Sequence, residues 1–168
     1  MRRFVHRHQE AISTAAWIKA GVGSLLALGW IGWLGQETGS PFLIGPFGAT
    51  IALLFGLPDS ALAQPANVMG GYVVATLAGL LLQALLPGHW WMVAIAVSLG
   101  LLGMAALRVL HPPAGAIPIL VASENPDWTY LFLPVLAGAA MLVLIAVAVH
   151  RCPPRGTAYP RPLPEAIE

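Results

Sequence analysis

Two short segments of the sequence carry the residues best suited to binding an anion. Pro46-Phe47-Gly48-Ala49 and Pro113-Ala114-Gly115-Ala116 each place a proline before small residues. Proline suits the first position of a helix, because the N–H that it lacks would be unpaired there. The amides that follow point out of the helix start, together with the positive end of the helix dipole. Each start therefore predicts a place where backbone N–H groups bind a small anion.

Polar side chains near these starts are further candidates. Arg108 and His111 are three residues apart and share one helical face if a helix continues between them. Alternatively, the Arg108 side chain extends to the membrane interface at the end of its span. The alternative for His111 is that it caps a helix or packs in the core. Gln64 and Asn67 flank Pro65 and are candidates for capping the following helix or for touching a ligand. The predicted substrate-binding residues are Gly45, Pro46, Phe47, Gly48, Ala49, Thr50, Gln64, Asn67, Arg108, His111, Pro112, Pro113, Ala114, Gly115 and Ala116.

Patterns for other chemistry are missing from the sequence. It shows no nucleophile–base arrangement, no paired carboxylates within an apolar run and no phosphate-binding glycine loop. His6, His8 and His89 have no carboxylate or cysteine partner at ligand spacing. We therefore expect no enzyme activity, no metal site and no cofactor.

The composition indicates what must position the candidate segments. Of 168 residues, 58% are hydrophobic and 9% are charged, whereas about 25% are charged in a typical soluble domain. A chain of this size buries only about 70% of its unfolded surface, and so few charges cannot hydrate the rest. This excludes a soluble globular domain, a disordered chain and an electrostatic nucleic-acid binder. The sequence predicts an all-α integral membrane protein, and the lipid bilayer is its expected partner.

The apolar residues form five blocks that define one transmembrane domain. The blocks are residues 11–35, 39–57, 67–86, 89–123 and 128–150. The second is interrupted by prolines and glycines, and His111-Pro112-Pro113 splits the fourth, because proline disfavours helix before it. We expect a basic cytoplasmic N-terminus over residues 1–10, a single transmembrane domain over 11–150, and a disordered, Pro-rich cytoplasmic tail over 151–168.

The two halves of this domain, residues 11–86 and 89–150, share an order of elements. Each has a long span, a broken short segment, an acidic turn and a second long span. The order predicts an internal duplication, although chance also supplies Pro-x-Gly-Ala matches in such a composition. Two broken helices in matched positions predict a binding site near the membrane midplane. The alternative is that small residues and prolines there serve close helix packing.

Basic residues favour the cytoplasmic side of short loops and so bear on topology. If the N-terminus, Arg108 and the tail are all cytoplasmic, the chain crosses six times, as three plus three with the second half inverted. The competing arrangement has four transmembrane helices and two re-entrant segments, and it places Arg108 outside. We favour six crossings, with both termini cytoplasmic.

Three motifs resemble those of the HPP family of integral membrane proteins. They are the stretch Ser40-Pro41-Phe42-Leu43-Ile44-Gly45-Pro46-Phe47-Gly48-Ala49, the stretch Leu62-Ala63-Gln64-Pro65-x-x-Val68-x-Gly70-Gly71, and His111-Pro112-Pro113-Ala114-Gly115-Ala116. The family is usually described with four transmembrane helices, and members in cyanobacteria and chloroplasts are associated with nitrite transport. Two positions depart from the pattern: family members often have glycine at Ala114 and a polar residue at Tyr72.

The residues and the resemblance together indicate a small anion as substrate. We expect a membrane transporter or channel for a small inorganic anion, with nitrite implied by the resemblance, in a bacterial inner membrane. A non-transporting membrane scaffold or sensor subunit is the alternative. A homo-oligomer fits so small a bundle, and no nucleic acid is expected as a partner.

Overall fold

The computed structural model describes residues 12–153 and 158–162, and every regular element in this part of the chain is helical. This confirms the predicted all-α class. The N-terminal segment 1–10 and the tail residues 154–157 and 163–168 lie outside the described residues. The elements are α2 (Thr14–Thr38), α3 (Gly45–Gly56), η1 (Ala61–Ala63), α4 (Pro65–Leu85), α5 (Trp90–Ala106), η2 (Pro112–Ala116), α6 (Ile117–Glu124), η3 (Trp128–Leu131), η4 (Phe132–Leu136) and α7 (Ala137–Arg151).

Local residues account for most of the helix ends. The side chain of Ser13 caps α2 by accepting a hydrogen bond from the Ala16 amide at 3.3 Å. α2 ends at Gly39 and α6 at Asn125, with φ of 67° and 48°. This left-handed conformation ends many helices and favours glycine or asparagine. α3 and α4 each carry a proline in the first turn, where its missing donor is harmless.

The last apolar block is not one continuous helix. Leu133 has the extended dihedrals φ −135° and ψ 117°, just before Pro134, because proline disfavours the helical region in the residue preceding it. Before this break, the Asp127 side chain caps η3 by accepting hydrogen bonds from the amide and the hydroxyl of Thr129. These bonds favour the carboxylate and lower the pKa of Asp127 below its usual value.

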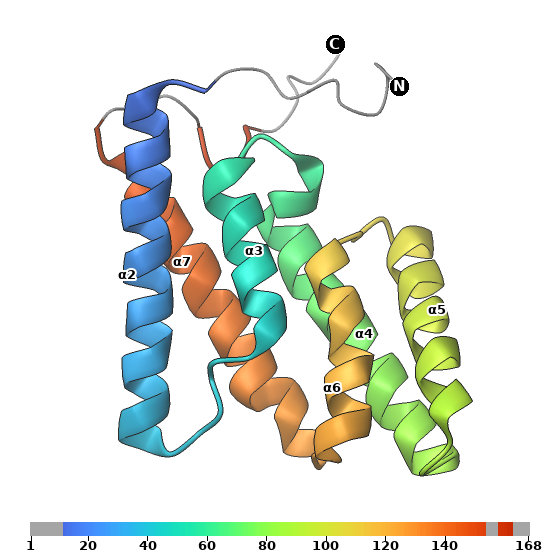
Figure 1. Ribbon diagram of the computed structural model, residues 1–168. Helices are drawn as coiled ribbons and strands as arrows, with labels where there is room; N and C mark the ends of the chain where they lie inside the picture. The colour runs from blue at the N-terminus through green and yellow to red at the C-terminus, as the bar shows by residue number, and fades with distance from the viewer. Residues whose placement is uncertain (1–11, 154–157, 163–168) are drawn as a thin grey trace, which may run out of the picture.

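The helical segments alternate in direction along the long axis of the bundle (Figure 1). Three of them are long and apolar enough to cross a membrane: Thr14–Thr38, Pro65–Leu85 and Trp128–Arg151. α3 and α5 are shorter apolar helices, and an extended segment, residues 39–44, carries the chain from the end of α2 back to the start of α3 (Figure 1). The number of membrane crossings stays a prediction.

The packing pairs the helices in a repeated pattern. In the order of elements, α2, α3 and α4 of the first half correspond to α5, α6 and α7 of the second. The contact of α2 with α7 then matches that of α5 with α4, and the contact of α4 with α6 matches that of α7 with α3. Pro65 begins α4, and Pro134 stands where regular helix resumes before α7. An inverted duplication would produce such a pattern, and the duplication itself stays a prediction.

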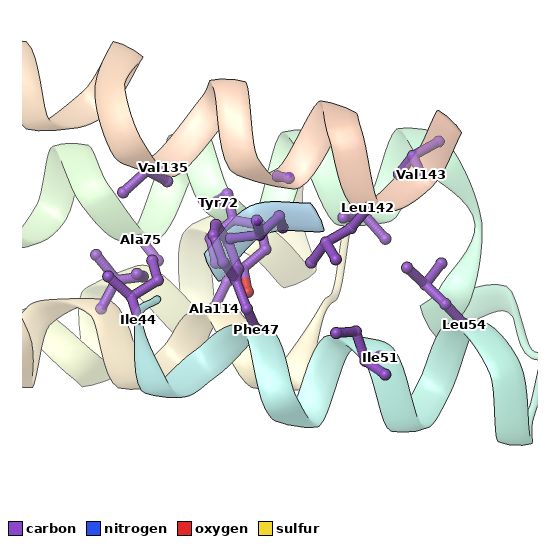
Figure 2. Packing of buried hydrophobic residues seen from close by; sticks show 14 of the residues in the cluster. Ile44, Phe47, Ile51, Leu54, Tyr72, Ala75, Ala114, Val135, Leu142 and Val143 are labelled. Atoms are coloured by element: carbon purple, nitrogen blue, oxygen red, sulfur yellow. The ribbon is translucent and has the colours of Figure 1, made fainter. Parts of the chain in front are cut away.

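A continuous apolar core lies between α3, α4, η2 and α7. Figure 2 shows Phe47 and Tyr72 near its centre, with Leu54 and Leu142 further along α3 and α7, and Ala114 belongs to the same cluster. Many large apolar side chains instead point outward, Trp90 and Leu25 among them. Since lipid is the natural surrounding of such a surface, the outward face fits a bilayer.

Within the tail, the described residues 158–162 differ from the expectation of disorder. Tyr159 is only 4% exposed, and its hydroxyl donates a hydrogen bond to the carbonyl oxygen of Ala63 at 2.9 Å. The amide of Arg161 donates to the side-chain oxygen of Gln64 at the same distance. Burial raises the pKa of the Tyr159 phenol above its usual value, which keeps this donor protonated. Residues 158–162 are therefore anchored beside the start of α4, because one aromatic side chain finds a buried partner there.

Candidate functional site

The two predicted helix starts are present, but their first amides are already used. The amide of Phe47 donates to the carbonyl of Ile44, and the amide of Ala114 donates to the carbonyl of His111, both at 3.0 Å. These two bonds occupy matching positions in the two halves. The prediction that the Phe47 and Ala114 amides are free to bind an anion is wrong, because each closes the first tight turn of its own segment.

Side chains fill the space between the two starts. Phe47, Tyr72 and Ala114 are fully buried and belong to one apolar cluster, part of which Figure 2 shows. The rings of Phe47 and Tyr72 pack edge to face, with centroids 5.5 Å apart. An anion bound between the starts would require these side chains to move.

Beside this packed centre lies a polar hub, which we define as the side chains of Thr50, Tyr72 and His111 with the carbonyl of Leu62. The hydroxyl oxygens of Thr50 and Tyr72 are 2.7 Å apart. Thr50 Oγ1 lies 2.9 Å from His111 Nε2, and His111 Nδ1 lies 2.8 Å from the Leu62 oxygen. All three side chains are fully buried. The hub joins α3, α4, η1 and the residue before η2.

The hydrogen bonds of the hub have a defined direction when His111 is neutral. A carbonyl oxygen only accepts, so His111 Nδ1 carries the hydrogen and donates to Leu62. His111 Nε2 is then the acceptor, and the Thr50 hydroxyl donates to it. The Thr50 oxygen in turn accepts from the Tyr72 hydroxyl. Each donor in the hub is paired with one acceptor.

The paired glycines Gly70 and Gly71 allow the segment that contains Val109 and His111 to lie close to α4. A Cβ added to Gly71 would lie 2.6 Å from the Cβ of His111, and one added to Gly70 would lie 2.8 Å from the Cβ of Val109. Real Cβ atoms do not approach neighbours so closely. The Asn67 side chain also donates to the Leu110 carbonyl at 3.0 Å. The segment 109–111 is therefore docked directly on α4.

Several other predicted site residues lie away from the hub. The Gln64 side chain donates to the carbonyls of Pro58 and Ser60, at 2.9 and 3.0 Å. Neither it nor Asn67 caps α4, which has no side-chain cap bond; that expectation is wrong because both side chains hold neighbouring segments instead. The exposed members of the predicted set are Gly45, Gly48, Ala49, Arg108 and Pro112, and the half-buried ones are Gln64, Asn67, Gly115 and Ala116.

Arg108 does not share a helical face with His111. α5 ends at Ala106, and Arg108 has a left-handed φ of 58°, so the chain turns between the two residues. Gly48 and Gly115 do have open space beside them, since a Cβ at either would meet no atom within 4 Å. Pro46 and Pro113 are buried. Of the predicted set, the structure brings Thr50 and His111 into direct contact.

Tyr72 is the hub residue that sequence reasoning left out of the site. Its hydroxyl completes the hub, and its ring lies 5.3 Å from that of His111 between centroids. The signal that could have found it is its position directly after the glycine pair Gly70-Gly71, where a polar group on α4 faces the segment that the glycines admit.

Tyr130 of η3 gives a further prediction. Its hydroxyl is buried and has no hydrogen-bond partner among the described residues. An unsatisfied buried hydroxyl costs about 1–3 kcal/mol, so Tyr130→Phe should raise the free energy of unfolding by about that amount. Tyr72→Phe removes a paired hydroxyl and should lower it by about 0.5–1.5 kcal/mol. Unfolding in detergent measures both, and equal losses in the two variants would contradict the assignment.

Long apolar helices around a buried polar hub define the class of this chain as an all-helical integral membrane protein. Comparison with known families then identifies which one: the transmembrane region of the HPP family matches residues 9–160. The chain belongs to the HPP family, which confirms the resemblance seen in the three motifs.

Two relatives from Dictyostelium discoideum are described as transmembrane proteins. One is 36% identical over 117 residues, which are 65% of this chain and 38% of the relative. The other is 34% identical over 116 residues, 64% of this chain and 41% of the relative. The match thus spans about two fifths of the length of each relative. No solved structure matches the chain.

Proposed function

We propose that this HPP family protein is a transporter or channel for a small inorganic anion, with nitrite as the leading substrate. The observation that carries the proposal is the polar hub, which places three hydrogen-bonding side chains in the apolar core where the start of α3 meets η2. Polar side chains inside a membrane protein are costly to bury and are typical of substrate pathways. The family resemblance supplies the choice of nitrite.

The chemistry of the hub suits a small monovalent anion. Hydroxyl and imidazole groups donate hydrogen bonds without a fixed full charge, which suits weak and reversible binding, and an anion would replace one of the partners that each donor has within the hub. Two short helical starts beside the hub add the positive ends of their dipoles. The proposal includes six crossings of a bacterial inner membrane with both termini cytoplasmic.

A non-transporting scaffold or sensor subunit is the second candidate, and one observation favours it. Phe47, Tyr72 and Ala114 are fully buried in one core cluster, and α3 contacts η2 directly. In that function the broken segments would serve close packing only. A transporter must open this contact during its cycle, whereas a scaffold would keep it closed.

Uptake into liposomes separates the two candidates. Purified protein is reconstituted, and uptake of nitrite, nitrate and formate is compared with uptake into protein-free vesicles of the same lipid. Protein-dependent uptake that saturates, with nitrite preferred, supports transport. If uptake equals that of empty vesicles for all three anions, the transport function fails and the scaffold is favoured.

Arg108→Gln should lower nitrite uptake about two- to fivefold and leave folding unchanged. Arg108 is exposed beyond the end of α5, and removing an exposed charge near an anion path costs about 0.5–1 kcal/mol of attraction. Initial rates at low and high salt measure the change, and salt should shrink it. Unchanged uptake at low salt would assign Arg108 to anchoring the chain at the interface.

A further inference from the structure

The polar hub contains a buried histidine, His111, that is hydrogen-bonded through both ring nitrogens. We propose that His111 Nε2 takes up one proton when the anion binds, and that the released Tyr72 hydroxyl is the donor that the anion engages. This inference rests on the proposed function and adds the co-substrate and its binding atom. It predicts that each anion enters with one proton, so that the pair carries no net charge.

With neutral His111, the hub has no free donor for an anion. The Tyr72 hydroxyl donates to Thr50, the Thr50 hydroxyl to His111 Nε2, and His111 Nδ1–H to Leu62. The side chains of Tyr72, Thr50 and His111 are fully buried, and Leu62, whose carbonyl completes the hub, is half-buried. An anion arriving alone would have to break one of these bonds and would meet no positive charge.

Protonation reverses two of the three bonds. A proton on His111 Nε2 makes that atom a donor, so the Thr50 oxygen must now accept from it. The Thr50 hydroxyl hydrogen then rotates to the Tyr72 oxygen, its other neighbour at 2.7 Å. Tyr72 keeps its own hydrogen but loses its acceptor. The added proton stays on His111, no covalent bond other than N–H forms, and one buried hydroxyl becomes free to donate.

The freed hydroxyl and the new charge favour the same ligand. A buried positive charge is costly unless it is paired, and the His111 ring lies 5.3 Å from the Tyr72 ring between centroids. A small anion that accepts from Tyr72 would pair this charge. Since coupling between two ligands is reciprocal, the proton strengthens anion binding by the same factor by which the anion strengthens proton binding.

The groups near His111 that lie on the neighbouring elements are mostly uncharged. α3 presents Thr50, η1 presents a carbonyl, and α5 presents the sulfur of Met104 near Gly71. Among the described residues, Tyr72 of α4 brings a titratable side chain into contact with the His111 ring. Arg108, three residues earlier, is exposed. A proton entering the hub is therefore held by His111.

Nuclear magnetic resonance of ¹⁵N-histidine-labelled protein in lipid nanodiscs tests the inference directly. The His111 signals are assigned by their loss in His111→Gln. Nitrite added at constant pH should convert His111 from the Nδ1–H tautomer to the imidazolium, and nitrite affinity should rise as the pH falls, by up to about tenfold per pH unit for one linked proton. A His111 spectrum that nitrite leaves unchanged overturns the inference.

Two threonine variants separate the hub from general packing. Thr50→Val should abolish the nitrite-dependent conversion of His111 to the imidazolium, because the hydrogen-bonded link between Tyr72 and His111 is lost. Thr76→Val is the matched control: Thr76 is equally buried, and its hydroxyl donates only to the Tyr72 backbone carbonyl. Equal loss in both variants overturns the inference. If Thr50→Val fails to fold, Tyr72→Phe, which keeps the ring, should abolish the change in its place.

Uptake by the wild-type protein distinguishes this inference from the proposed function. With the membrane potential held at zero, an acidic exterior should accelerate nitrite uptake above that of empty vesicles. Uptake that follows the potential and ignores the pH gradient overturns proton coupling and leaves transport standing. Nitrite-dependent protonation of His111 without uptake supports the coupled site and contradicts transport.

Discussion

His111→Ala should lower the free energy of unfolding by about 2–5 kcal/mol and abolish anion uptake. The substitution leaves the Leu62 carbonyl and the Thr50 hydroxyl without their partner, and a buried group left unsatisfied costs about 1–3 kcal/mol. It also opens a cavity beside Tyr72 in a fully buried site. Chemical unfolding of the purified protein in detergent measures the loss.

The matched control for this substitution is His89→Ala. His89 is exposed before the start of α5, and its ring stacks on Trp91 with centroids 5.0 Å apart. Substitutions at such surface positions usually change stability by less than about 0.5 kcal/mol. Similar losses in the two variants would mean that His111 contributes no more than an exposed histidine, which would contradict the hub.

Gly71→Ala should destabilise the protein by about 1–3 kcal/mol, even though alanine favours helix. A methyl group at this position would lie 2.6 Å from the Cβ of His111 and 3.2 Å from the backbone oxygen of Val109. Forcing such an approach typically costs about 1–3 kcal/mol, and it pushes His111 away from Thr50. Unfolding in detergent and the ¹⁵N signals of His111 should both change.

Gly48→Ala tests whether that loss comes from contact rather than from the loss of a glycine. An added Cβ at Gly48 meets no atom within 4 Å. The substitution should therefore be neutral or stabilise α3 by up to about 1 kcal/mol, which is the helix preference of alanine over glycine. A loss at Gly48 as large as the loss at Gly71 would refute the close approach of His111 to α4.

The helices were largely predictable because their signals are local. Composition alone defines an apolar helical chain, and Pro46, Pro65 and the pair Pro112-Pro113 mark the places where segments begin. The break at Leu133–Pro134 and the end of α5 at Ala106 were less visible. α5 ends in a turn without glycine, so the spacing of Arg108 and His111 suggested a shared face that does not exist.

The hub was only partly predictable because its members are far apart in the chain. Thr50 and His111 are separated by 61 residues, and nothing local indicates which of many polar residues they meet. Tyr72 joined them only because Gly71 admits the close approach. The sequence also could not show that the Phe47 and Ala114 amides are used within their own turns, since that depends on the tightness of each turn.

Two neighbouring carbonyls, those of Leu62 and Ala63, are held by side chains from two later and separate parts of the sequence. His111 donates to the first and Tyr159 to the second. The two peptide planes meet at the α-carbon of Ala63, so a rotation of one must be absorbed there or passed to the other. The segment 158–162 and the His111 side chain are therefore hydrogen-bonded to adjacent peptide groups, one on either side of the Ala63 α-carbon.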